Sequence, residues 1–96
     1  MEILQEIPNE LIDSINIFNN WNKADENDAK NLGEGISKCV TLTSLNLNLR
    51  GNSINQNGAK SLGEGISKCV HLTSLTLDLF RNSIGEDGAK HLGEGI

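Results

Sequence analysis

Two hydrophobic patterns follow each other along this chain of 96 residues. From Leu45 to Arg50 every second residue is a leucine, and this period of two is typical of a half-buried strand. Before it, small and aliphatic residues recur at the spacing i, i+3, i+4 and i+7, which builds one apolar face of a helix. These residues are Ala29, Leu32, Gly33 and Ile36. The pattern therefore predicts a helix followed by a strand.

The same two patterns return further along the chain. Residues 31–60 and 61–90 align without a gap, and 21 of the 30 positions carry the same amino acid. The sequence LGEGISKCV begins at Leu32 and again at Leu62, and its first half returns at Leu92. A fixed period of this size predicts a solenoid, in which each coil stacks on the next.

Each repeat is expected to add one strand and one helix. Asp25, Asn55 and Gly85 occupy equivalent positions and are tolerated at a helix N-cap, so we expect helices to begin after them. A strand joined to the next strand through a helix implies a right-handed crossover and a parallel sheet. The leucines then point inward, and the side chains between them stand on the open face of the sheet. The predicted fold class is α/β.

These positions resemble a known family. Leu47, Leu49, Asn52 and Ile54 fit the L-x-L-x-x-N-x-I core of leucine-rich repeats, and the next repeat matches again. The flanking helix is similar to the ribonuclease-inhibitor-like subclass through Gly58, Ala59, Leu62 and Cys69. The resemblance covers roughly residues 21–96. It implies a solenoid with parallel strands on a concave face, helices on a convex face, and binding of a protein or peptide on the strands.

The chain departs from that pattern at one point. Ser44 and Ser74 stand where a first leucine is expected, which suggests a strand about two residues longer than in the subclass. Asn52 and Asn82 follow the strands, where an amide side chain can pair backbone groups that a buried turn would leave unsatisfied. Because Asn22 aligns with them, we expect a ladder of three such residues.

The two ends differ from the regular repeats. Residues 1–20 are interpreted as an N-terminal cap or degenerate first repeat, and Trp21 as a packing residue of that cap. Residues 21–96 are the repeats, with the last one truncated. No polar cap follows the third helix, so we expect Leu92, Ile96 and a strand edge to be exposed. The chain is then either a fragment of a longer array or uses this end for self-association.

Composition and charge exclude several classes of function. The net charge is −5, and residues 1–20 contain four acidic side chains and no lysine or arginine. Binding to nucleic acid needs clustered cations, so we expect no nucleic-acid partner. The acidic start does not fit a signal peptide, and no stretch approaches transmembrane length. We therefore expect a cytoplasmic protein that contacts no membrane.

The candidates for chemistry are weak. Gly33 and Gly35 complete neither a dinucleotide fingerprint nor a P-loop, so we interpret them as sites of tight packing beneath the helix. Cys39 and Cys69 are predicted to be reduced, buried thiols, too far apart for a disulfide. The two histidines occupy different repeat positions, and no four-ligand metal set forms. We expect no enzyme activity, cofactor or metal.

The more informative residues are those that differ between the repeats. Several of the nine differing positions are outward side chains of the strands, whereas the leucines between them are unchanged. Exposed aromatics beside arginine are enriched among binding hot spots. The side chains predicted to contact a partner are Phe18, Asn46, Asn48, Arg50, Thr76, Asp78, Phe80 and Arg81. Copy drift on an unconstrained surface explains the same variation equally well, since surface substitutions usually cost little.

The predicted function is a protein-interaction module whose strand face binds a protein or peptide. The main alternative is a regulatory segment of a larger protein, such as a repeat-bearing kinase, with catalysis outside these residues. A further alternative is a structural element whose faces are covered by neighbours in a large assembly. The sequence leaves the partner and the number of repeats open.

Overall fold

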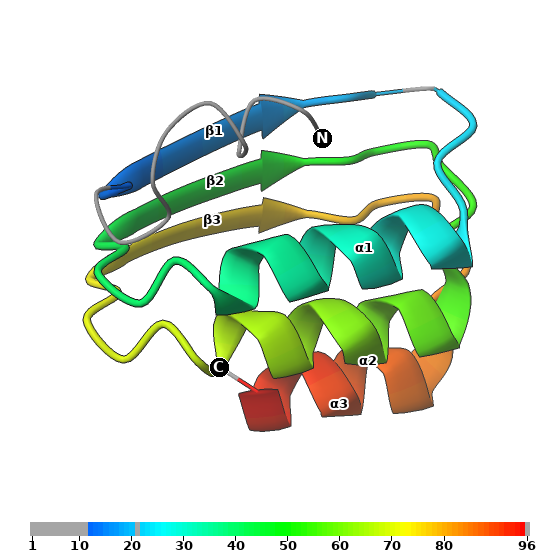
Figure 1. Cartoon of the computed structure of the whole chain (residues 1–96). Coiled ribbons are helices and arrows are strands. Elements are labelled where there is room, and N and C mark those ends of the chain that lie inside the picture. The colour runs from blue at the N-terminus through cyan, green and yellow to red at the C-terminus, as the bar shows by residue number, and fades with distance from the viewer. Residues whose placement is uncertain (1–11, 21, 96) are drawn as a thin grey trace.

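The computed structural model describes residues 12–20 and 22–95, in which strands and helices alternate. The strands are β1 (Ser14–Phe18), β2 (Ser44–Asn48) and β3 (Ser74–Asp78), and the helices are α1 (Glu26–Ser37), α2 (Asn55–Ile66) and α3 (Gly85–Gly95). The three strands form one sheet in the order β1-β2-β3, with all neighbours parallel. The described part of the chain is therefore a mixed α/β fold (Figure 1).

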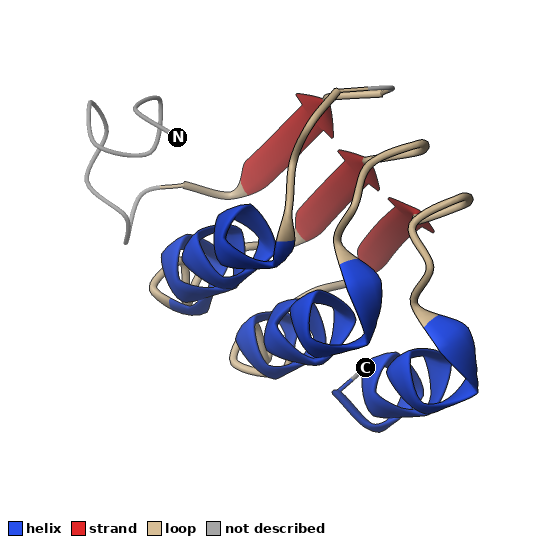
Figure 2. Ribbon diagram, turned by 90° about the vertical axis from the view of Figure 1, so that its right-hand side faces the viewer, coloured by secondary structure: helices blue, strands red, loops and turns tan. Residues whose placement is uncertain are grey.

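Equivalent sequence positions lie side by side in the sheet. Ser14 pairs with Ser44, and Ser44 pairs with Ser74, as the alignment of the repeats predicts. The helices lie next to each other and cover one face of the sheet (Figure 2). No helix of the described residues covers the other face, which we call the open sheet face.

The core lies between the sheet and the helices. Leu45, Leu47 and Leu49 are at most 3% exposed, and the apolar residues of α1 that the sequence pattern selects are all buried. The ladder of β2 ends at Asn48, but the alternation continues one step further. Leu49 remains in the core and donates its N–H to the carbonyl of Asp78 at 2.9 Å. Packing of the leucines therefore sets the direction of every intervening side chain.

Only the first helix begins as the sequence predicts. Asp25 is the N-cap of α1 and forms a capping box with Asp28. Asn55 and Gly85 are instead the first residues of α2 and α3, with φ angles of 62° and 67°. The side chain of Asn55 still accepts a hydrogen bond from the N–H of Gly58 at 3.1 Å. It therefore satisfies a backbone donor of the first turn, as an N-cap side chain would.

The glycines of the helices let neighbouring helices approach closely. A methyl group at Gly33 would lie 2.5 Å from the carbonyl oxygen of Ser61 in α2. One at Gly65 would overlap the carbonyl of Gly33. The prediction of tight packing beneath the helix is therefore wrong in direction, because the close contact is lateral. Gly93 occupies the equivalent position in α3, and no described atom lies within 4 Å of a methyl group there.

Asparagine side chains link successive turns of the chain. Asn82 is 1% exposed, and its amide donates to the carbonyls of Leu49 at 2.7 Å and of Leu79 at 3.1 Å. Its Oδ1 accepts the N–H of Ile54 at 3.3 Å. Asn52 repeats this arrangement with the preceding turn.

The third member of the expected ladder is absent from it. Asn22 is exposed and donates to Oδ1 of Asn19 at 2.8 Å, so among the described residues its amide forms only local bonds. The two bonded asparagines each bridge to backbone atoms of the turn before them, whereas Asn22 belongs to the first described turn. Asn22 aligns with the other two in sequence, but within the described residues only Asn52 and Asn82 link successive turns.

The described C-terminal end differs from the expectation in one residue. Leu92 is 8% exposed and belongs to the core, so the prediction that it is open to water is wrong. The apolar residues nearest this end are only partly buried; they are Leu72, Leu75, Leu77, Leu79 and Ile84. The predictions for residues 1–11, Trp21 and Ile96 lie outside the described residues.

Candidate functional site

The predicted partner-binding residues occupy the open sheet face and the turns that follow its strands. Each of the eight is exposed or half-buried. Phe18 and Phe80 are 67% and 57% exposed, a large apolar area for side chains of this size. Phe18 lies on β1, however, and β2 separates it from Phe80. The structure therefore gathers only part of the predicted set into one cluster.

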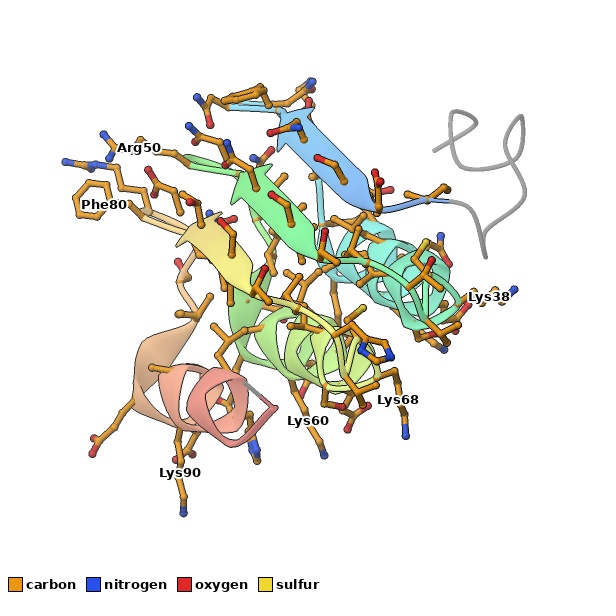
Figure 3. The ribbon with its side chains drawn as sticks, turned by 90° about the vertical axis from the view of Figure 1, so that its left-hand side faces the viewer. Lys38, Arg50, Lys60, Lys68, Phe80 and Lys90 are labelled. Atoms are coloured by element: carbon orange, nitrogen blue, oxygen red, sulfur yellow. The ribbon has the colours of Figure 1, made fainter. Side chains whose placement is uncertain are left out.

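That cluster is formed by Arg50, Asp78, Phe80 and Arg81, which we call the Phe80 cluster. Arg50 contacts Oδ2 of Asp78 through Nε at 3.2 Å and through Nη2 at 3.0 Å. Its guanidinium carbon also lies 5.1 Å from the centre of the Phe80 ring. Figure 3 shows Arg50 and Phe80 together beyond the ends of the strands, far from the lysines of the helices. Asp78 thus fixes a cation beside an exposed aromatic ring.

Arg81 supplies a second cation to the same ring. Its guanidinium carbon is 5.4 Å from the ring centre of Phe80. The backbone of Arg81 has a φ of 58°, in the left-handed region that glycine occupies without strain. In the preceding repeat this position is Gly51, with a φ of 73°. Positions 51 and 81 therefore share a left-handed backbone angle, but of the two only position 81 carries a side chain.

The carboxylate of Asp78 is held in its charged form. The backbone N–H of Phe80 donates to Oδ1 at 3.0 Å and is the largest cause that lowers the pKa of Asp78 below its ordinary 3.8. The hydrogen bond and charge of Arg50 lower this pKa further, while partial burial opposes them. Arg50 is about half exposed, so the ion pair orients the side chains more than it stabilises the fold.

Apart from Phe18, the remaining predicted residues form a neutral polar area beside this cluster. Asn46 and Asn48 are half-buried on β2, and Thr76 is exposed on β3. Asn48 pairs in register with Phe18 on one side and with Asp78 on the other. Its Oδ1 atom is buried and has no hydrogen-bond partner among the described residues. These side chains offer amide and hydroxyl groups rather than charge.

A hollow of about 810 Å³ adjoins the Phe80 cluster at the free edge of β3. Its polar lining includes Arg50, Asp78 and Arg81, and its apolar lining consists of Leu77, Leu79, Phe80, Ile84 and Leu92. An apolar side chain placed here would lie next to the charged groups. The sequence analysis did not identify this hollow, because it depends on the unpaired edge of the sheet.

The cysteines are free and buried, which confirms the prediction of two reduced thiols. Burial raises the pKa of both, and the proximity of Cys39 raises that of Cys69 further. Cys69 Sγ lies 3.7 Å from the carbonyl oxygen of Cys39, so the two residues stack in neighbouring repeats. Within residues 12–20 and 22–95, no group of three or more His, Cys, Asp and Glu side chains could hold a metal ion.

Comparison with protein-family models, with curated proteins and with solved structures found no match for this chain. In the part of the chain that the structure describes, no helix is both long enough and apolar enough to cross a membrane. The site must therefore be interpreted from its own geometry.

The sequence analysis missed two features of the exposed surface. Val40 and Val70 are 49% and 78% exposed in the turns that follow α1 and α2, although the pattern does not mark them. The strained backbone of Arg81 was also missed, but a signal for it exists. Gly51 stands at the equivalent position, and a glycine in a turn often marks a positive φ.

Proposed function

We propose that the chain is a protein-interaction module that binds a protein or peptide on its open sheet face. In this proposal the three parallel strands and their helices are part of a cytoplasmic leucine-rich-repeat solenoid, with the open sheet face as its concave side. The observation that carries the proposal is the Phe80 ring, 57% exposed and contacted by two guanidinium groups. The module is proposed to have no catalytic activity of its own.

The physical argument is that this cluster has the features of a binding hot spot. Phe80 offers a large apolar surface, and burial of apolar area drives most association between proteins. Asp78 holds Arg50 in place before a partner arrives, which reduces the entropy that binding would otherwise cost. The neutral amides and hydroxyl of the neighbouring strands provide further hydrogen-bonding groups at the rim.

The variation between repeats supports the same placement. Leu47 and Leu77 are identical because both pack toward the helices, while Arg50 and Phe80 differ at equivalent positions on the exposed side. A surface shaped for one partner needs different side chains along its length, although the repeat that supports it is constant.

A random-peptide display library tests the proposal. Peptides are selected on the full chain and then measured against a variant with Arg50→Ala, Asp78→Ala and Phe80→Ala. We expect the selected peptides to lose binding to this variant, while its circular dichroism stays unchanged. Peptides that bind the wild type and this variant equally would place the interaction elsewhere.

A matched variant controls for the number and kind of substitutions. Lys60→Ala, Glu64→Ala and Val70→Ala also remove one cation, one anion and one exposed apolar side chain, from positions on α2 and the turn after it. We expect this variant to bind the selected peptides like the wild type. An equal loss of binding in both variants would contradict a specific role for the Phe80 cluster.

Self-association through the β3 end is a second candidate function. The leucines of β3 are half-buried, whereas those of β2 are buried, so a second copy packing there would remove apolar surface from water. A methyl group at Gly93 would meet no described atom within 4 Å, whereas the equivalent Gly33 packs against the backbone of α2. Light scattering should then show a mass that rises with concentration, and Gly93→Gln should suppress the rise. A monomer at all concentrations would exclude this candidate.

A further inference from the structure

Arg81 is the guanidinium of the Phe80 cluster that has no carboxylate partner among the described residues. Arg50 is bound to Asp78, whereas the contact recorded for Arg81 is the ring of Phe80 at 5.4 Å. A guanidinium group carries five N–H donors in its plane and no acceptor. A contact with a ring does not use these donors, so they remain able to bind an acceptor such as a carboxylate.

Backbone N–H groups at the edge of β3 also lack a hydrogen-bond acceptor among the described residues. In the preceding repeat, Leu49 donates its N–H to the carbonyl of Asp78, and Gly51 donates to that of Phe80, both at 2.9 Å. The equivalent donors one repeat later belong to Leu79 and Arg81. Neither donates a hydrogen bond to any residue of the described ranges. The turn after β3, beside the hollow, therefore presents donors from the backbone and from the side chain of Arg81.

The turns that follow the strands are positively charged. Residues 19–24, 49–54 and 79–84 contain Lys23, Arg50 and Arg81 and no Asp or Glu, although the whole chain has a net charge of −5. This local field favours an anionic group and disfavours a cationic one. The carboxylate of Asp78, which directly precedes the third of these turns, is already paired with Arg50.

The backbone of Arg81 is the third observation. Its φ of 58° lies in a region that costs an L-residue energy, and Gly51 shows that this turn accepts glycine. Strained residues of this kind gather at functional sites, where the side chain is needed in one direction. Here the strain accompanies a guanidinium that lies over an exposed ring and has no carboxylate partner in the part of the chain that the structure describes.

We propose that the partner contributes an acidic peptide segment whose Asp or Glu carboxylate binds the guanidinium of Arg81. An apolar side chain next to that acid enters the hollow lined by Leu77, Leu79 and Ile84. This inference rests on the proposed function and names the chemistry of its partner. It assigns Arg81 to recognition of the carboxylate, while Arg50, held by Asp78, positions the ring of Phe80.

The display library provides the probes. Peptides selected on the wild-type chain at low salt are expected to be enriched in Asp and Glu next to an apolar residue. Each acidic residue is then changed to its amide, and binding is measured by fluorescence anisotropy. Loss of a bidentate charged contact should weaken binding about tenfold or more, and higher salt should weaken the parent peptide more than its amide version.

Variants of the chain assign the effect to one residue. Arg81→Gln keeps a side chain on the left-handed backbone, so its stability should stay close to that of the wild type, and it should bind acidic peptides about tenfold more weakly. Lys90→Gln removes the same charge from α3, on the side opposite Phe80 (Figure 3), and should leave binding unchanged. Thermal unfolding of each variant confirms that the fold is retained.

The possible outcomes separate this inference from the proposed function. Peptides that lose binding to the variant with Arg50, Asp78 and Phe80 replaced, but need neither their acidic residues nor Arg81, would overturn the inference and leave the proposed function standing. If no selected peptide depends on the open sheet face, both fail. Binding of a single-stranded oligouridylate that depends on Arg81, without binding of acidic peptides, would instead indicate a phosphate ligand and overturn the inference.

Discussion

Replacing Asn82 with Ala should destabilise the chain more than any other asparagine substitution at this repeat position. The substitution removes an amide that is 1% exposed. The carbonyl of Leu49 keeps its bond from Asn52 at 2.8 Å, and that of Phe80 keeps its bond from Gly51 at 2.9 Å. The N–H of Ile54 and the carbonyl of Leu79 lose the partner that Asn82 provided.

The magnitude follows from these two groups. A buried polar group without a partner costs about 1–3 kcal/mol, and Leu79 is only half-buried, so the expected loss is about 2–4 kcal/mol. This is a large fraction of the stability of a small domain, which is about 5–15 kcal/mol. For a urea dependence of about 1 kcal/mol per M, the midpoint of unfolding should fall by about 2 M or more.

Asn22→Ala is the matched control, since it deletes the same amide at the equivalent position of the first described turn. Asn22 is exposed, and its bonds to Asn19 and to the N–H of Lys23 are local. Its loss should cost about 0.5 kcal/mol or less. Urea unfolding followed by circular dichroism measures both. Equal losses in the two variants, or a change below about 0.5 kcal/mol for Asn82→Ala, would refute the bridging role of the buried amide.

Three further predictions concern packing, charge and the thiols. Gly33→Ala should destabilise the chain by several kcal/mol, because its methyl group would meet the backbone of α2. Gly93→Ala should instead stabilise α3 by about 0.5–1 kcal/mol, because no described atom lies within 4 Å of its methyl group. Urea unfolding of the two variants measures the difference. The pKa of Asp78 is lowered in the folded chain, so this carboxylate adds stability above its ordinary pKa of 3.8, and that stability is lost as the pH falls through the folded pKa. Between about pH 5 and pH 2, Asp78→Asn should therefore lose less stability than the wild type, as measured by acid titration of the unfolding midpoint. The two cysteines should react with a thiol reagent only as fast as the chain opens, and rapid labelling of the folded chain would contradict their burial.

The sequence predicted those features that depend on periodic packing. The leucine alternation sets the strands and their inward faces, and the repeat period sets the register in which Ser14, Ser44 and Ser74 pair. The cap of α1 was also predictable, because Asp25 and Asp28 satisfy each other through bonds within four residues. Local chemistry and a fixed period are both properties that a single sequence displays.

The errors concern features that depend on what the neighbouring repeat does. Asn22 aligns with Asn82 but forms only local bonds among the described residues, so alignment alone overestimated the ladder. Gly33 was expected to pack against the layer beneath it, whereas the adjacent helix approaches it from the side. All four residues of the Phe80 cluster were among the predicted contacts, but their grouping apart from Phe18 was not predicted. The residues of the cluster come from β3 and from two turns, and the direction of Arg81 depends on a backbone angle that only Gly51 hints at.

Arg81 bears most directly on the choice between a surface shaped for a partner and a surface that varies by copy drift. Neutral drift accumulates substitutions that cost little stability, and most exposed positions satisfy that condition. The left-handed turn at positions 51 and 81 does not, because any side chain there costs energy that glycine avoids. Drift therefore accounts less well for Arg81 than for the substitutions on the strands. A role for this side chain in binding supplies the compensating reason.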